Sequence, residues 1–458
     1  MLAIVGLVLA ARPMPPVLAQ AIAGGSRVVD YQARTTAAGP VLEQQVLKPD
    51  GSSVLVGTAI AQDFALEANA QSGTRNLYLL RKTRGDTVML WLTDSLGRTL
   101  HQRRQHLPRM SGSTKLLAPP HLFGLPGGQG FVFTYPSGKS GRPALEITAL
   151  SPALSVVWQQ QFAPPYLSAV QHIAASDTYL WLVLKEYLAL SLRPRVLSFR
   201  LATGEVACNQ SLAPNDALDG AAVVPAGLLL LGTSDRRGAY TTPADQLESS
   251  EYRRDFALLL RPTGQRDFGV SLGWPPSGRP PHYRWQSAGP LPNGGYQLVG
   301  ETYRTPLKAS TIALGILGAG LIGAGGFGVI PMSGYTTERP LGLVLAQLST
   351  TGQVSAVREL AASDLAQAPA PVPPGPNPSQ SFPVCFRFQG FSPDYKQLVL
   401  STDRQVLAYT IATQQLRPLT PAHHSTPTIF AIEANRVTIR WSLHSNATGA
   451  EFEQIALP

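Results

Sequence analysis

Four carboxylates lie beside short apolar runs, and they are the residues best placed for acid–base chemistry: Asp94, Asp255, Asp267 and Glu301. Glycoside hydrolysis needs a pair of such groups, which only have to meet in space. Capping of turns and exposure to solvent are the alternative roles for each of them. The catalytic residues stay unknown at this stage.

Other candidate motifs lack the spacing that their chemistry requires. Ser137–Gly141, "SGKSG", contains the Gly-Lys-Ser of a phosphate loop, but Phe133 stands where the first Gly is needed. His423 and His424 are adjacent, so in a strand they would face opposite sides and could not hold one metal ion together. No GxSxG, HExxH or calcium-loop pattern occurs. We therefore predict neither a metal nor a cofactor.

Two cysteines, Cys208 and Cys385, are present without a CxxC motif, which excludes a thiolate zinc site. They are either two separately buried thiols or a disulfide across the fold, which would require their Cα atoms to be within reach. The net charge of +9 is spread along the chain, with its densest run at Arg98–Arg109. Nucleic-acid binders concentrate basic residues on one face, so we predict no nucleic-acid partner.

Composition and patterning predict an all-β chain. Only 14% of residues are charged, and 42 Gly and 40 Pro disfavour helices. Seven pairs of strand-length runs, rich in Val, Ile, Leu and aromatic residues, follow one another: Leu77–Leu80 with Val88–Leu92, Phe131–Tyr135 with Ala144–Leu150, Tyr179–Leu184 with Val196–Leu201, Leu228–Leu231 with Phe256–Leu260, Tyr296–Val299 with Leu341–Leu348, Leu398–Ser401 with Val406–Ile411, and Thr428–Ile432 with Val437–Leu443. Trp91, Trp158, Trp181 and Trp441 all lie in expected strands and are expected to pack in the core or between blades.

Similar turns close the second member of most pairs. Gly97, Gly204, Gly264 and Gly352 would supply the positive φ that such turns need, while "SPALSVVW" (Ser151–Trp158) and "IATQQLRPL" (Ile411–Leu419) fill the same place without Gly. The spacing of the turns gives a period of ~50 to 65 residues, which is typical of propeller blades. The pattern predicts a single β-propeller of about seven blades over residues 20–458.

The blade pattern resembles that of secreted bacterial β-propellers, and "YLALSLRPRVLSFRLATGEVA" (Tyr187–Ala207) is similar to a quinoprotein-type blade repeat. Such repeats close with a Trp a few residues after the Thr-Gly pair, and none follows Thr203 and Gly204 here. The resemblance therefore implies the architecture and not the quinone cofactor.

Three segments stand apart from the repeat. Residues 1–19, with an apolar run from Leu2 to Ala11, resemble a secretory signal peptide cut after Ala19. Residues 367–383 are Pro-rich and are expected to form an extended loop. Residues 309–332 hold no charge and many glycines. They are an insertion folded onto the propeller, a surface that contacts lipid or a partner protein, or a transmembrane helix.

Three functions are compatible with these features. The first is an exported binding or scaffold module at the cell envelope, whose loops recognise a protein or a glycan. The second is a secreted hydrolase or lyase that acts on glycan or peptide in the propeller channel. The third is an envelope component that contacts the membrane through residues 309–332. The predicted location is secreted, periplasmic or at the cell envelope.

Overall fold

The structure is a computed structural model that describes residues 27–36, 39–48, 52–60, 63–107, 120–139, 142–187, 192–213, 216–234, 254–272, 282–304, 339–360, 386–402, 404–421, 427–433, 435–441 and 451–458. The expected signal peptide 1–19, the apolar segment 309–332, the Pro-rich segment 367–383, His423, His424 and Cys385 lie outside these residues.

The described strands form eight antiparallel sheets, which we number in chain order. Sheet 1 contains β1 (Arg27–Thr36), β2 (Gly39–Leu47) and β3 (Ser53–Ala59). Sheet 2 contains β4 (Phe64–Ser72), β5 (Arg75–Lys82), β6 (Thr87–Thr93) and β7 (Thr99–His106). Sheet 3 contains β8 (His121–Gly124), β9 (Phe131–Lys139), β10 (Arg142–Leu150) and β11 (Val156–Phe162), with a 3₁₀ turn, η2 (Pro126–Gly128), between the first two. Sheet 4 contains β12 (Leu167–Ala175), β13 (Tyr179–Tyr187), β14 (Leu192–Arg200) and β15 (Val206–Ser211).

The remaining four sheets repeat the same plan. Sheet 5 contains β16 (Asp216–Val224), β17 (Gly227–Ser234), β18 (Arg254–Leu260) and β19 (Arg266–Ser271). Sheet 6 contains β20 (His282–Pro290), β21 (Tyr296–Arg304), β22 (Arg339–Leu348) and β23 (Val354–Leu360). Sheet 7 contains β24 (Arg387–Phe391), β25 (Gln397–Ser401), β26 (Val406–Thr410) and β27 (Gln415–Pro418). Sheet 8 contains β28 (Pro427–Ile432), β29 (Arg436–Trp441) and β30 (Glu451–Ala456).

All seven predicted strand pairs are confirmed as hydrogen-bonded neighbours, each pair in a sheet of its own. In sheets 2 to 7 they are the two middle strands of four. Sheet 1 precedes them and was not expected, so the described residues form one more sheet than the predicted count of about seven.

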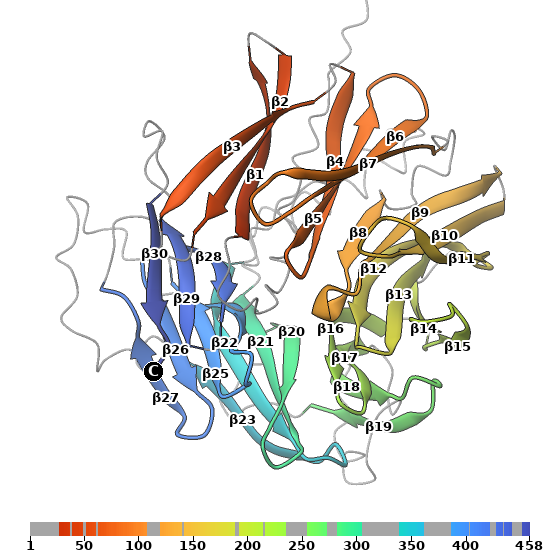
Figure 1. The fold of residues 1–458 in the computed structure, drawn as a ribbon. Coiled ribbons are helices and arrows are strands. Elements are labelled where there is room, and N and C mark those ends of the chain that lie inside the picture. The colour runs from red at the N-terminus through yellow and green to blue at the C-terminus, as the bar shows by residue number, and fades with distance from the viewer. Residues whose placement is uncertain are drawn as a thin grey trace, which may run out of the picture.

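The sheets follow one another around a ring, from the first sheet in red to the last in blue (Figure 1). The first strands of successive sheets contact each other, as β4 does β8 and β16 does β20, so these strands lie nearest the axis. The fourth strands lie at the rim, and β7 is exposed along most of its length. This is the architecture of a β-propeller, and it confirms the all-β prediction.

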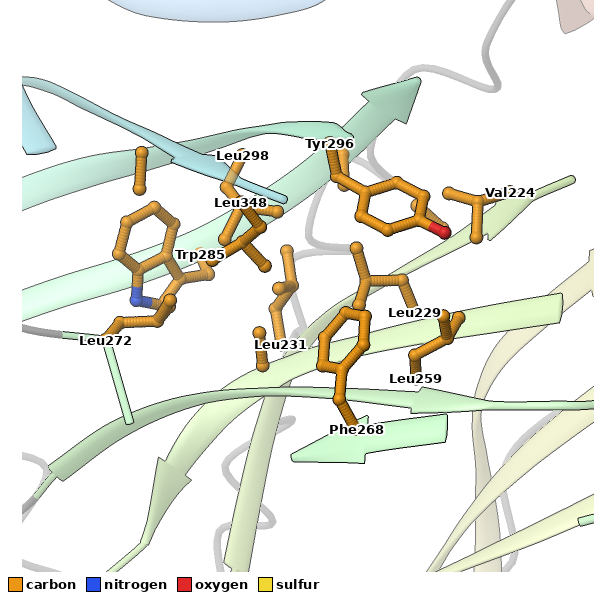
Figure 2. Packing of buried hydrophobic residues seen from close by; sticks show 14 of the residues in the cluster. Val224, Leu229, Leu231, Leu259, Phe268, Leu272, Trp285, Tyr296, Leu298 and Leu348 are labelled. Carbon is orange, nitrogen blue, oxygen red and sulfur yellow. The ribbon is translucent and has the colours of Figure 1, made fainter. Parts of the chain in front are cut away.

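A hydrophobic cluster fills each seam between consecutive sheets, from sheets 1 and 2 to sheets 7 and 8. Figure 2 shows the seam between sheets 5 and 6, where Leu231 and Leu259 face Trp285 and Leu298. Burial of each large apolar side chain contributes ~1.5–3 kcal/mol. Sheets with a neighbour on each side bury both faces, and the middle strands are therefore continuous apolar runs, such as Leu228–Leu231.

Similar turns, of five residues in sheets 2 to 6 and of four in sheet 7, join the third and fourth strands around the ring. Gly97, Gly204, Gly264 and Gly352 have φ of 77°, 73°, 84° and 83°, as the sequence predicted. The two turns without Gly place Leu154 and Gln414 at the same point, with φ of 64° and 54°. A side chain there is strained, so the fold requires this backbone shape strongly enough to impose it on two residues other than Gly.

The propeller has two unlike faces. In sheets 2 to 7, the connections from first to second strand and from third to fourth strand have two to six residues and all lie at one end of the sheets, which we call the turn face. Connections from second to third strand, and from one sheet to the next, begin and end at the opposite end, the loop face. Every connection of more than six residues in these sheets starts on the loop face: 107–120, 235–253, 272–281, 305–338, 361–386 and 419–426.

Candidate functional site

The loop face is built to be polar. In sheets 2, 4, 5, 6 and 7 the first strand has a β-bulge at an equivalent point, which adds one residue opposite the second strand. The added residues are all polar: Glu67, Gln171, Asp219, Gln286 and Gln389. Bulges often occur beside functional sites, where they redirect a side chain.

The second strand of each sheet changes character at the level of the bulge. The two residues directly before this level are apolar, and the second residue beyond it is polar or charged in the same five sheets: Arg81, Lys185, Thr233, Glu301 and Ser401. Packing between sheets ends where the strands approach the loop face, so these positions no longer need an apolar residue. The polar strand ends make this face the candidate binding surface.

The structure separates the four candidate carboxylates into two groups. Asp94 and Asp267 lie at the turn face, in sheets 2 and 5, because Asp94 begins the connection between β6 and β7 and Asp267 is the second residue of β19. Asp255 is the second residue of β18 and Glu301 lies in the last half of β21, so both are on the loop face, in neighbouring sheets. The four therefore do not form one constellation around the channel.

Both turn-face carboxylates stabilise their own turns. Asp94 Oδ1 accepts hydrogen bonds from the backbone N–H groups of Leu96 and Arg98, and Arg98 Nε lies 2.8 Å from Asp94 Oδ2. Burial acts to raise the pKa of Asp94, but the hydrogen bonds and charge of Arg98 outweigh it and lower that pKa. Asp267 pairs with Arg261 at 2.6 Å. Turn capping is thus the role that the structure gives these two residues.

A buried charge cluster at the loop end of sheet 4 was not found from the sequence. Glu186 in β13 has a fully buried side chain and lies between two arginines of β14. Arg193 Nε donates to Glu186 Oε2 at 2.9 Å, and Arg195 Nε donates to Oε1 at 2.6 Å. Arg195 Nη1 also donates to Asn209 Oδ1 at 2.6 Å. The carboxylate therefore fixes both guanidinium groups at the edge of the seam between sheets 3 and 4.

Aromatic side chains surround these arginines. The guanidinium of Arg193 lies 5.1 Å from the ring centroid of Tyr166, and that of Arg195 lies 5.8 Å from Phe162. Tyr166, in the connection before β12, is 42% exposed. We call Tyr166, Glu186, Arg193 and Arg195 the sheet 4 cluster. Its members come from three separate stretches that only the pairing of β12, β13 and β14 brings together.

A second aromatic–cation pair occupies the other side of the same strand. Lys185 and Tyr187 flank Glu186 in β13, and alternate residues of a strand face opposite sides. Lys185 Nζ lies 5.9 Å from the Tyr187 ring, which is 37% exposed. Tyr187 is opposite Leu167, the residue after Tyr166. The two exposed tyrosines therefore border the loop end of sheet 4 from both sides.

The first strands of sheets 3 and 4 each contain a buried histidine. His121 in β8 is opposite Thr134, and His172 in β12 is opposite Val183, directly after the bulge of that strand. Each Nε2 is buried and makes no hydrogen bond among the described residues, and the same is true of Thr134 Oγ1. Burial lowers the pKa of His121, and it lowers the pKa of His172 to about 4. Both imidazoles are therefore neutral at pH 7.

Other sequence candidates have structural roles. Trp91, Trp158, Trp181 and Trp441 are all buried, as predicted. Trp158 Nε1 donates to Leu201 O at 2.6 Å and so links sheets 3 and 4. The stretch Ser137–Gly141 joins β9 and β10 of one hairpin, in which Gly138 is opposite Pro143, and not a strand to a helix.

The thiol of Cys208 is buried in β15, against the turn that contains Gly264. Burial raises the pKa of this thiol, although a backbone hydrogen bond from Gln210 opposes the effect. Its pairing with Cys385 involves a residue outside those described. In the described ranges, no three His, Cys, Asp or Glu residues are arranged to hold a metal ion. No helix there has the length and apolarity to cross a bilayer.

No protein-family model matches the chain, and no curated protein matches it. Among solved structures, the chain is similar to a prolyl endopeptidase, with 14% identity, a TM-score of 0.42 and coverage of 94% of this chain. It spans only 55% of the length of that enzyme. It is also similar to a periplasmic gluconolactonase from Pseudomonas aeruginosa (11% identity, TM-score 0.40, covering 96% of this chain and 99% of the other). A third is TolB from Acinetobacter baumannii (13% identity, TM-score 0.28, covering 86% and 80%).

Proposed function

We propose that this protein is an exported propeller that acts as a binding or scaffold module at the cell envelope and recognises its partner with the loop face. The observation that carries the proposal is the difference between the two faces. Short turns close the sheets at one end, and polar strand ends, from which the long connections start, lie at the other. Rigid scaffolds commonly carry their recognition residues on such connections.

The sheet 4 cluster supports the same face as the recognition surface. Two exposed tyrosines, Tyr166 and Tyr187, stand beside cations, and hydrogen bonds to Glu186 fix the position of Arg193 beside Tyr166. Aromatic and arginine side chains are the residues that contribute most to binding at protein interfaces. On the turn face, by contrast, Asp94 and Asp267 are engaged in holding their own turns.

Site-specific photo-crosslinking in intact cells tests the choice of face. A benzophenone amino acid would replace Arg84 or Tyr187 on the loop face, and Leu96 or Val206 on the turn face, all four of which are exposed. We expect discrete high-mass adducts from the loop-face positions only. Adducts from the turn face alone, or equal adducts from both faces, would contradict the proposal.

Export is tested separately by fractionation. We expect the full chain to reach the periplasm or the medium with residues 1–19 removed, and a chain that starts at Gln20 to stay in the cytoplasm. Retention of the full chain in the cytoplasm would refute the export part of the proposal while leaving the face assignment intact.

A further inference from the structure

The two arginines of the sheet 4 cluster keep hydrogen-bond donors beyond those that Glu186 uses. Arg193 contacts Glu186 Oε2 through Nε and Nη2, and Arg195 uses Nε and Nη1 for Glu186 and Asn209. Arg193 Nη1 and Arg195 Nη2 make no hydrogen bond among the described residues. The side chains are 20% and 12% exposed, so solvent or a ligand reaches their edges.

Charge at this strand end favours an anion. Arg193 and Arg195 carry two positive charges, and Glu186 supplies one negative charge, so the cluster has an excess of one positive charge. A guanidinium presents its N–H groups in a planar fork that matches a carboxylate better than it matches most other anions. Because Glu186 holds both forks in place, little side-chain entropy is lost when a second carboxylate binds.

The aromatic surface indicates the rest of the ligand. Tyr166 is 42% exposed beside Arg193, and Tyr187 is 37% exposed beside Lys185. A sugar ring presents C–H groups on its flat side, which pack against the face of an aromatic ring, and its hydroxyls bind polar neighbours. The unit that combines a flat ring, hydroxyls and a carboxylate is a uronic acid.

We propose that the sheet 4 cluster is a binding site for a carboxylate-bearing glycan, with Arg193 and Arg195 on the carboxylate and Tyr166 against the sugar ring. This inference rests on the proposed function, because it names the class of partner that the loop face recognises.

Isothermal titration of the purified chain that starts at Gln20 tests the site, with tetragalacturonate as the probe. We expect saturable binding that weakens as salt rises from 50 to 500 mM, because ion pairs near the surface are screened. The methyl-esterified tetramer lacks the negative charge and should bind at least about ten-fold more weakly. Equal binding of both tetramers, or no binding of either at low salt, would overturn the inference.

Two substitutions locate the site, and a third is the control. Tyr166→Ala removes an exposed ring and should weaken tetragalacturonate binding about ten-fold or more. Arg193→Gln tests the carboxylate contact in the same way. Arg200→Gln is the matched control, because it breaks an exposed ion pair with Glu205 on the turn face of the same sheet and should leave binding unchanged. Unchanged affinity in Tyr166→Ala would place the glycan elsewhere and refute the assignment.

The photo-crosslinking experiment separates failure of this inference from failure of the proposed function. If adducts still form from Arg84 on the loop face while tetragalacturonate does not bind, the loop face recognises another class of partner and only the glycan inference fails. If neither adducts nor binding are found, both proposals fail. Should Tyr166→Ala not fold by circular dichroism, Tyr166→Leu keeps an apolar side chain at this exposed position, removes the ring and repeats the test.

Discussion

Replacement of Glu186 by Gln tests whether the sheet 4 cluster fixes the loop end of its sheet. The carboxylate is fully buried and carries a hydrogen bond from Arg193 on one oxygen and from Arg195 on the other. A neutral amide still accepts one of these bonds but turns an N–H₂ group towards the other guanidinium. Removal of one partner from a buried ion pair costs ~3–5 kcal/mol. Because the arginines are 20% and 12% exposed, we expect a loss near the lower end, about 3 kcal/mol.

Urea unfolding followed by tryptophan fluorescence measures this loss as a shift of the midpoint at constant slope. Glu205→Gln is the control, since its ion pair with Arg200 has side chains that are 67% and 56% exposed, and it should change stability by less than about 0.5 kcal/mol. A double-mutant cycle adds Arg195→Gln. The double variant should lose less than the sum of the single variants, because the second substitution removes the charge that the first left without its partner.

A loss below about 1 kcal/mol for Glu186→Gln would refute the reasoning, because the arginines would then be sufficiently solvated without their carboxylate. Additive losses in the cycle would show that Glu186 and Arg195 act independently, and the cluster would not be a fixed unit.

Three further predictions concern the seams and the faces. The pKa of His172 is about 4 in the folded chain against 6.5 in the unfolded chain, so the unfolded state binds more protons between these pH values. The free energy of unfolding should therefore fall by up to about 3 kcal/mol as the pH drops from 6.5 to 4. His172→Leu should reduce this fall. A Cβ at Gly124 would lie 1.7 Å from the carbonyl oxygen of Gln71 in the neighbouring sheet, so Gly124→Ala should lower the free energy of unfolding in urea by at least about 3 kcal/mol. Gly127 has open space around it and a φ of 62°, so Gly127→Ala should lower it by only about 1 kcal/mol. Replacement of residues 305–338 by Asn-Gly should keep the circular dichroism spectrum of the full chain, because the flanking residues of β21 and β22 are opposite each other and a two-residue turn can join them.

Each of these predictions has an outcome that would contradict it. A pH dependence that is the same in His172→Leu and the parent would show that other groups titrate in this window. Equal losses at Gly124 and Gly127 would mean that β4 and β8 can move apart. Loss of the β-sheet spectrum on removal of residues 305–338 would mean that this segment contributes to folding.

The middle strands of the sheets could be predicted from the sequence because both of their faces are buried. Leu228–Leu231 and Phe256–Leu260 are apolar without interruption, and such runs are easy to recognise. The rim strands could not, because β7 and β15 pack on one side only and carry polar residues at most positions. Sheet 1 was missed for a related reason, since polar and small residues dominate β1 in the sequence.

The candidate site could not be predicted because it depends on strand register. Glu186 and Arg193 are seven positions apart, and nothing in their spacing marks them as partners until the hairpin between β13 and β14 is known. Strand ends alone suggested Asp94 and Asp267, which belong to the turn face. Because successive antiparallel strands run in opposite directions, the order of the predicted strands already tells which strand ends share a face. This order would have separated Asp94 and Asp267 from Asp255 and Glu301.

The pairing of Arg304 with Arg339 has a consequence for how the protein can diverge. The segment between them leaves β21 and returns to β22 at one point on the ladder, so a single passage of that segment through a bilayer is incompatible with the hairpin. Insertions or deletions at this point leave the register of β21 against β22 unchanged. A descendant of this protein can therefore carry a longer, a shorter or a different connection here and keep the same hairpin.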